Sequence, residues 1–177
     1  MLFIPNLLLI AGMGTSSGKT TMACRIIEQF RDLNITAIKI SPHFHKTTLG
    51  LNAICEEEGY AIYEETDGET LKDTSRMLNA GASKAYYARS LDENLLFVFN
   101  KIKGLIPDGT PIICESPALR NYIEPGVFII MTSDTKDKPK NISHLQDLPH
   151  AIFKLEELNK ISSVPVIFEN GSWVYRQ

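Results

Sequence analysis

The sequence predicts an α/β fold: a mostly parallel central sheet with helices on both faces, built from residues 1–177 as a single domain. Two patterns predict it. Runs of strand length alternate along the chain with segments of helical periodicity, which is typical of βαβ units. Several of these runs are apolar throughout, as in strands buried on both faces of a sheet. A chain of 177 residues is also long enough to bury a substantial core.

The expected strands are short apolar runs rich in β-branched residues. The first precedes a glycine-rich loop, the second is stopped by Pro42, and a later one ends on an acid. They lie at 7–11, 35–40, 82–88, 110–115 and 127–132, with shorter ones at 60–63 and 151–153. In the tail, Asn170-Gly171 separates two β-rich runs, which predicts an antiparallel hairpin at one edge of the sheet.

The expected helices carry apolar residues three or four positions apart, which gives each one a core-facing side. Gly81 is a natural end for the second of them. The helices are expected at 18–34, 70–80, 91–105 and 155–161. Residues 50–59, of which Glu56-Glu57-Glu58-Gly59 are polar, predict no definite element. The charged segment 134–141 predicts a flexible loop.

Composition narrows the classes of partner. The net charge of -3 provides no basic field for nucleic acid or for an anionic membrane. Residues 1–10 are apolar but only about half as long as a membrane span, and they have no basic leader, so they predict a buried strand. Cys24, Cys55 and Cys114 are too few and too scattered for a disulfide framework. We therefore expect reduced thiols in a cytoplasmic protein with no nucleic-acid or membrane partner.

A glycine-rich loop joins the first strand to the first helix, in the run Gly12-Met-Gly-Thr-Ser-Ser-Gly-Lys-Thr20. Glycines let backbone N–H groups turn inward toward an anion, and the start of a helix adds further unpaired N–H groups. Lys19 can contact the β- and γ-phosphates, and the Thr20 hydroxyl can ligate Mg²⁺. The expected nucleotide-binding residues are Gly14, Thr15, Ser16, Ser17, Gly18, Lys19, Thr20 and Thr21. The segment predicts a site for Mg²⁺ with ATP or GTP.

The glycine spacing departs from the usual phosphate loop, in which four residues separate the first glycine from Gly-Lys. Gly12 is one residue too far from Gly18, and Gly14 is one residue too near. The alternative interpretation is a glycine-rich turn that opens an ordinary helix. The apolar strand before the loop and the amphipathic helix after it favour the phosphate site.

Two further residues at strand ends are candidates for the same site. Glu115 ends the run 110–115, where an acid can hold Mg²⁺ directly or through water, and the alternative is a solvent-exposed strand end. Lys39 lies late in the second strand, where it either extends toward solvent or meets an anion such as the γ-phosphate. We expect Lys19 and Lys39 to be the catalytic cations.

The segment 72–76 and the loop after the second strand hold the remaining candidates. Asp73 and Arg76 can offer a magnesium ligand and a phosphate ligand from one side of a helix start, or can form a local ion pair at an exposed one. His43 and His45 are two residues apart, but a third metal ligand is not evident. They are better explained as polar loop residues near a substrate pocket.

Three segments resemble a known family. The lengthened loop 12–20 is similar to that of dethiobiotin synthetase and the cobyrinic acid amidases. Together with its helix, the stretch Ile38-Lys-Ile-Ser-Pro-His-Phe-His45 and the stretch Lys72-Asp-Thr-Ser-Arg-Met-Leu-Asn-Ala-Gly-Ala82, it resembles the molybdopterin-guanine dinucleotide biosynthesis protein B family. The order and separation of the segments match over roughly the first half of the chain. After Glu115, the family's Gly-Phe-Lys is replaced by Ser116-Pro117-Ala118.

The resemblance implies a Mg²⁺-dependent phosphate-loop NTPase, commonly a homodimer, with weak hydrolysis and an accessory role in cofactor maturation. It also implies that Lys39, Asp73 and Arg76 are site residues. Three functional classes remain open: an adaptor whose nucleotide state controls a protein partner, a ligase that phosphorylates a carboxylate, and a small-molecule kinase. The run Asp134-Thr-Lys-Asp137 lacks the spacing of a guanine-recognition element, so ATP and GTP both remain open.

Overall fold

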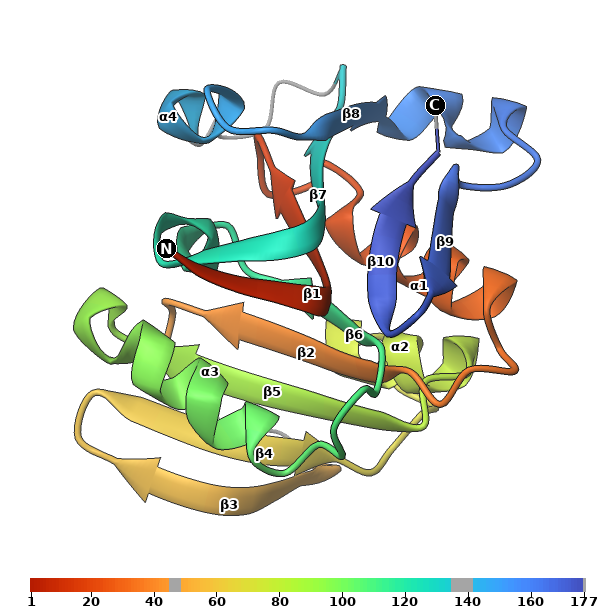
Figure 1. Cartoon of the computed structure of the whole chain (residues 1–177). Coiled ribbons are helices and arrows are strands. Elements are labelled where there is room, and N and C mark those ends of the chain that lie inside the picture. The colour runs from red at the N-terminus through yellow and green to blue at the C-terminus, as the bar shows by residue number, and fades with distance from the viewer. Residues whose placement is uncertain (45–48, 135–141, 177) are drawn as a thin grey trace.

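An eight-stranded sheet lies at the centre of the computed structural model, which describes residues 1–44, 49–134 and 142–176 (Figure 1). Its strands are β1 (Leu2–Gly12), β2 (Thr36–Ser41), β3 (Leu51–Glu57), β4 (Tyr60–Glu65), β5 (Lys84–Ser90), β6 (Ile112–Glu115), β7 (Ile123–Thr132) and β8 (Ala151–Lys154). A separate hairpin holds β9 (Val166–Glu169) and β10 (Ser172–Tyr175). The helices are α1 (Lys19–Gln29), α2 (Asp73–Ala80), α3 (Leu95–Lys103) and α4 (Ser143–Gln146), with 3-10 turns η1 (Asp92–Asn94), η2 (Ala118–Asn121) and η3 (Leu155–Lys160).

The strand order is β3-β4-β5-β2-β6-β1-β7-β8. The neighbours from β5 to β8 pair in parallel, while β4 pairs antiparallel with both β3 and β5. The predicted mostly parallel α/β sheet is therefore confirmed. Because parallel strands share a direction, the carboxyl ends of β1, β2 and β6 meet at one edge, where the candidate site residues lie.

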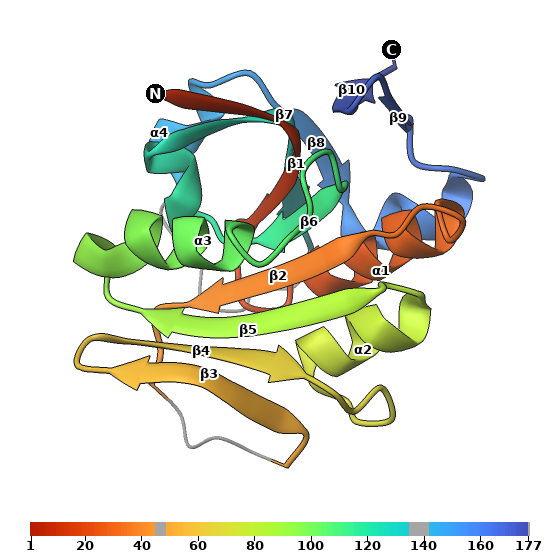
Figure 2. The same ribbon diagram turned by 60° about the horizontal axis from the view of Figure 1, so that its bottom comes forward.

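Helices cover both faces of the sheet, as predicted (Figure 2). On one face, α1 and α2 pack with η3 and the β9–β10 hairpin. On the other face, α3, η2 and α4 pack against a second apolar cluster. Burying an aliphatic side chain stabilises a fold by about 1.5–3 kcal/mol, and α1 alone buries Met22, Ala23, Ile26 and Ile27. No helix in the described ranges has the length and apolar character needed to cross a membrane.

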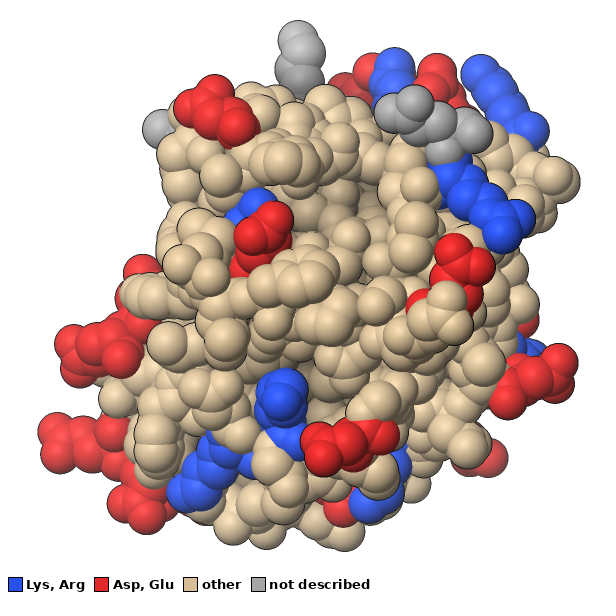
Figure 3. Space-filling view, viewed as in Figure 1, with Lys and Arg blue, Asp and Glu red and all other residues tan. Residues whose placement is uncertain are grey.

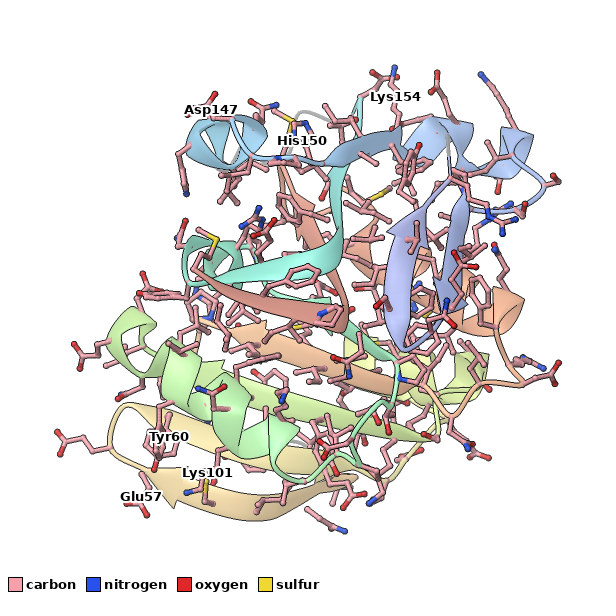
Figure 4. The ribbon with its side chains drawn as sticks, viewed as in Figure 1. Glu57, Tyr60, Lys101, Asp147, His150 and Lys154 are labelled. Carbon is pink, nitrogen blue, oxygen red and sulfur yellow. The ribbon has the colours of Figure 1, made fainter. Side chains whose placement is uncertain are left out.

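The cover formed by α3 extends to the antiparallel edge of the sheet. Lys101 lies over the rings of Tyr60 and Phe97, with its ammonium 5.7 and 5.5 Å from the two ring centroids. Figure 4 shows Lys101 of α3 beside Tyr60, at the start of β4. Such cation–π contacts contribute about 0.5–1 kcal/mol at exposed sites. Since Phe97 belongs to α3, it is the contact with Tyr60 that links α3 to β4.

The position predicted for the terminal hairpin was wrong. It is antiparallel, with the turn at Asn170-Gly171 in the left-handed region, but it forms its own sheet and does not extend an edge of the central one. Strand β8 forms the edge of the central sheet next to β7, one of the two edges where the hairpin could have added strands. Within the hairpin, buried Trp173 packs edge-to-face on Phe168, with ring centroids 5.1 Å apart. It also packs edge-to-face on Phe30 at the end of α1, with centroids 5.3 Å apart, and this contact holds the hairpin against the α1 side of the sheet.

Within residues 50–59, Leu51–Glu57 form a strand, β3, that the sequence did not predict. Glu56 and Glu57 lower strand propensity, yet β3 pairs with β4 along its length at the edge of the sheet. Cross-strand partners compensate for the acids: the Tyr63 hydroxyl donates to Glu56, and Arg89 Nη2 lies 3.5 Å from the same carboxylate. Tertiary pairing therefore overrides local propensity.

Several boundaries also differ from those predicted. The helix expected at 18–34 ends at Gln29, because Phe30 leaves helical geometry and a tight turn follows. The helix expected from 70 begins at Asp73. Thr70 stays outside it, because its hydroxyl oxygen accepts a hydrogen bond from the Lys72 amide and its own amide donates to Ser75 Oγ. The charged loop predicted at 134–141 lies outside the described residues after Asp134.

The long strands β1 and β7 bend together where their register shifts, between Ile4 and Leu8. Gly126 lies at this bend, and a β-carbon there would come within 2.2 Å of the Pro5 carbonyl oxygen and 2.8 Å of the Trp173 carbonyl oxygen. Both atoms belong to backbones that cannot move without unseating β1 or the hairpin. The close approach of three segments therefore requires glycine.

We predict that Gly126→Ala lowers the free energy of unfolding in urea by about 1–3 kcal/mol, the usual cost of overpacking a fixed interior. Gly104→Ala is the matched control, because Gly104 has a helical φ of -65° and its nearest neighbour is 3.5 Å away. We expect no loss of stability in the control. Equal stability of the two variants would contradict the packing described here.

Candidate functional site

The glycine-rich loop spans the gap between the end of β1 at Gly12 and the start of α1 at Lys19. The Met13 amide donates to the Met131 carbonyl at 3.0 Å, so the loop leaves the sheet in register with β7. Gly18 takes a left-handed φ of 84°, which turns the chain into the helix. A β-carbon at Gly18 would also lie 2.6 Å from Leu155 Cδ1, so η3 packs directly on this junction.

Lys19 turns inward beneath the loop. Its side chain is buried, and Nζ donates to the Gly14 carbonyl at 3.0 Å and lies 3.4 Å from Ser17 Oγ. Ser17 Oγ donates to the same carbonyl at 3.0 Å. A β-carbon at Gly12 would come within 2.1 Å of Ser17 Oγ and 2.8 Å of Lys19 Cγ. Gly12 thus makes room for the lysine, which gives the unusual glycine spacing a physical reason.

Four predicted residues form one polar cluster at the carboxyl ends of β2 and β6. Thr20 Oγ1 donates to Glu115 Oε2 at 2.8 Å, and Lys39 Nζ lies 3.0 Å from Glu115 Oε1. Lys39 Nζ also donates to Asp73 at the start of α2. Lys39 and Glu115 are opposite one another in the β2–β6 register, so the sheet itself sets their separation. Of the interpretations left open for Lys39 and Glu115, those that place both at a common site fit the structure.

The cluster shifts the proton affinities of its members. Burial alone would lower the pKa of Lys39, but attraction to Glu115 and Asp73 raises it above its ordinary value. Burial would raise the pKa of Asp73, but attraction to Lys39 and a hydrogen bond from it hold that pKa below its usual range. Both groups are therefore charged across the neutral range.

Arg76 lies one turn along α2 from Asp73 and points toward α1. Its Nη2 is 3.5 Å from Thr21 Oγ1, and its Nη1 is 4.0 Å from Asp73 Oδ1. The local ion pair considered for Asp73 and Arg76 is therefore loose, because the closer partner of Asp73 is Lys39. These weak contacts leave the guanidinium able to take an anionic ligand.

A cavity of about 360 Å³ opens between these groups. Of the predicted site residues, those that line it are Thr15, Ser16, Gly18, Lys19, Thr20, Thr21, Lys39, Asp73, Arg76 and Glu115. Gly14 and Ser17 are absent from the lining and instead bond to Lys19 or to each other. The structure thus brings together residues from the glycine-rich loop, α1, β2, α2 and β6 that the sequence separates by up to 100 positions.

The cavity also has lining residues that were not predicted as ligands: Ile40, Ser41, Pro42, His43, Pro117 and Leu155. His43 does lie beside the pocket, as its loop position suggested, whereas His45 lies outside the described residues. Leu155 comes from η3, far along the chain, and its apolar side chain gave no signal of a site. Only the parallel pairing of β8 with β7 brings it to this edge.

The donor set fits magnesium only in combination with phosphates. Thr20, Asp73 and Glu115 offer hard oxygen ligands, which is what Mg²⁺ prefers. Within the described residues, however, there is no group of three or more His, Cys, Asp or Glu side chains that could hold a metal ion unaided. Mg²⁺ commonly takes one or two protein ligands and completes its shell with water and phosphate oxygens. These residues are suited to that arrangement.

Comparison with known proteins found no match to a protein family, a curated protein or a solved structure.

The face seen in Figure 3 carries acidic and basic side chains interspersed around its rim, with a largely uncharged centre.

We predict that the Lys39 cluster makes stability pH-dependent at both extremes. The lowered pKa of Asp73 adds stability that is present above its ordinary value of 3.8 and is lost as pH falls through the folded value. The raised pKa of Lys39 adds stability that is present below 10.5 and is lost as pH rises through its folded value.

Lys39→Met should therefore cost about 2–4 kcal/mol of unfolding free energy at neutral pH, because it leaves buried Glu115 without its cation. The difference from the natural chain should shrink below pH 3.8 and above pH 10.5. Lys84→Met is the control, since the Lys84–Glu64 pair is exposed and its loss should change little. A pH-independent penalty in Lys39→Met would contradict this account.

Proposed function

We propose that this chain is a phosphate-loop protein that binds a nucleoside triphosphate together with Mg²⁺. The observation that carries the proposal is Lys19, a buried lysine that lines the cavity at the N-terminus of α1 and whose ammonium donates to the Gly14 carbonyl of the loop. A lysine held there by the Gly14 carbonyl can exchange that neutral acceptor for a phosphate oxygen, which is a stronger charge-assisted partner.

The start of α1 supports the same ligand. The first turn of a helix leaves amides without partners in the helix, and no side chain caps α1. The cavity lies directly against Gly18, Thr20 and Thr21 in this turn. The helix dipole adds partial positive charge at that end, so the position favours an anion. The phosphates of a nucleotide meet these requirements along the loop 14–20.

Within this proposal, magnesium is held by Thr20 and by the carboxylates of Glu115 and Asp73, and it neutralises charge on the phosphates. The direct Thr20–Glu115 hydrogen bond supports the assignment, because it sets two oxygen ligands 2.8 Å apart, facing the cavity. Lys19 and Lys39 are then placed to stabilise negative charge on a γ-phosphoryl group as it leaves. Arg76 supplies a further cation from α2.

The finer proposal is an accessory NTPase in cofactor biosynthesis that acts as a homodimer with a protein partner and hydrolyses its nucleotide slowly. It rests on the resemblance of segments 12–20, 38–45 and 72–82 to the molybdopterin-guanine dinucleotide biosynthesis protein B family. Cys24, Cys55 and Cys114 are free thiols, which supports a reducing cytoplasmic location.

A second candidate is an ATP-dependent ligase or a small-molecule kinase. It is supported by the extension of the cavity beyond Lys39 to Ser41, Pro42 and His43, where an acceptor could lie. The candidates differ in kinetics. An accessory protein should turn over slowly until its protein partner binds, whereas a ligase or kinase should be stimulated strongly by a small acceptor.

We predict that Lys19→Ala weakens Mg²⁺-nucleotide binding by about a hundredfold, which is two tenfold steps of about 1.4 kcal/mol each. The loss arises because the phosphates would face a neutral side chain. Titration calorimetry with non-hydrolysable ATP and GTP analogues measures it, and circular dichroism verifies the fold. Lys103→Ala, at the end of α3 on the opposite face, should bind like the natural chain. A folded Lys19→Ala variant with unchanged affinity would refute the proposal.

Thr20→Ala should act on the metal and spare the phosphate contacts of the loop. Nucleotide affinity in EDTA should stay within about twofold of the natural chain, while the gain in affinity on adding Mg²⁺ should fall by about tenfold, since one of the few protein ligands is lost. Thr21→Ala is the matched neighbour, because its hydroxyl contacts Arg76 and is not assigned to the metal. If both variants keep the full magnesium effect, Thr20 is not a ligand.

A further inference from the structure

A second cavity, of about 530 Å³, runs along the outer side of α1. Helix α1 contributes Thr21, Cys24, Arg25 and Glu28, which are spaced three or four residues apart and so share one face of the helix. This face differs from the one formed by Met22, Ala23, Ile26 and Ile27, which packs on the sheet. The remaining lining residues are Arg76 of α2 and Leu155, Glu156, Leu158 and Asn159 of η3.

This cavity adjoins the phosphate cavity, because Thr21, Arg76 and Leu155 line both of them. Lys19 and Thr20 line the phosphate cavity, and under the proposed function the β- and γ-phosphates bind beside them. Thr21 is the next residue along the helix and stands at the boundary between the two spaces. A phosphate chain that runs from Lys19 toward Thr21 therefore ends at the entrance to the second cavity.

The chemistry of the lining suits the remainder of a nucleotide. Leu155, Leu158 and Cys24 provide an apolar middle, which matches the flat faces of a base. Glu28, Glu156 and Asn159 provide polar groups that can bond to base edges or to ribose hydroxyls. The lining thus combines an apolar patch with polar and charged groups, and a nucleoside presents both kinds of surface.

The Cys24 thiol takes part as a packing surface and not as a nucleophile. Burial raises the pKa of Cys24 to about 11, so the thiol is protonated at neutral pH. Arg25 is held by the Ile161 carbonyl, which fixes the wall formed by α1 against the segment after η3. Two neighbouring contacts reinforce this wall: Gln29 Nε2 donates to the Val164 carbonyl at 3.0 Å, and the Val164 amide donates to Gln29 Oε1 at 2.8 Å.

We propose that this groove between α1 and η3 binds the nucleoside half of the nucleotide, with the base against Cys24 and Leu155 and the α-phosphate near Thr21 and Arg76. The inference rests on the proposed function, since it assigns the second half of the same ligand. Under this proposal, the outer side of α1 and the turn η3 make the contacts by which the chain binds a nucleotide more tightly than a bare polyphosphate.

The test compares Mg²⁺-tripolyphosphate with Mg²⁺-ATP and Mg²⁺-GTP by titration calorimetry. In the natural chain we expect at least one nucleotide to bind about tenfold or more tighter than tripolyphosphate, because only the nucleotide fills the groove. Cys24→Trp fills the groove with an indole. In this variant nucleotide affinity should fall at least about tenfold, while tripolyphosphate affinity stays within about twofold.

Asn100→Trp is the control, since it adds the same indole at an exposed position of α3 that lines neither cavity, and it should bind both ligands like the natural chain. Thermal unfolding verifies that each variant is folded. If Cys24→Trp does not fold, Asn159→Trp narrows the same groove from the exposed side of η3 and gives the same comparison.

The outcomes separate the two proposals. A folded groove-filling variant with full nucleotide affinity, or a natural chain that binds nucleotides no tighter than tripolyphosphate, overturns the nucleoside site but leaves the phosphate site intact. A natural chain that binds neither tripolyphosphate nor nucleotide overturns the proposed function and this inference together.

Discussion

The Lys39 ammonium between Glu115 and Asp73 is the interaction on which the organisation of the site depends. It joins the ends of β2 and β6 to the start of α2. Glu115 is almost fully buried, and an unpaired carboxylate there would cost several kcal/mol. The cation therefore fixes two carboxylates in one place, and its attraction holds the pKa of Asp73 below its usual range. Thr20 then bonds to the same Glu115 and brings the start of α1 into the cluster.

This arrangement also limits how the site can work. In this structure the charge of Lys39 compensates the carboxylates that are proposed to hold magnesium. A divalent cation bound at Glu115 and Asp73 would compete with Lys39 by like-charge repulsion, and the ammonium would be favoured to turn toward phosphate. Metal binding at the carboxylates is unfavourable while Lys39 stays there, and Lys39 has no reason to leave them unless a phosphate is present. Metal and nucleotide should therefore bind as one complex. That coupling is consistent with the lack of a metal cluster in the described residues that could act alone.

The features that could be predicted are those indicated by residues close together in the sequence. The loop 12–20 and the periodicity of α1 define a strand, a turn and a helix without information from elsewhere. Glu115 and Lys39 could be placed near the loop because parallel strands bring their carboxyl ends to one edge. Strand β3 could not be predicted, because its acids are compensated by Arg89 and Tyr63 across the sheet. The hairpin was predicted as a hairpin, but its location depends on Trp173 packing on Phe30, a contact between segments 143 positions apart.

Leu155 shows most clearly why the second half of the site escaped sequence analysis. It touches the glycine-rich loop at Gly18 and lines both cavities, yet it is an ordinary leucine in a 3-10 turn. Its role follows only from β8 pairing with β7, which carries η3 over the end of β1. The C-terminal third of the chain then closes on α1 through Arg25 and Gln29. Helix α1 is thus held from both sides, with its first turn facing the phosphate cavity and its outer side facing η3. A ligand long enough to contact both regions would bridge the N-terminal loop and the C-terminal segments, so its binding should stabilise α1 and η3 as one unit.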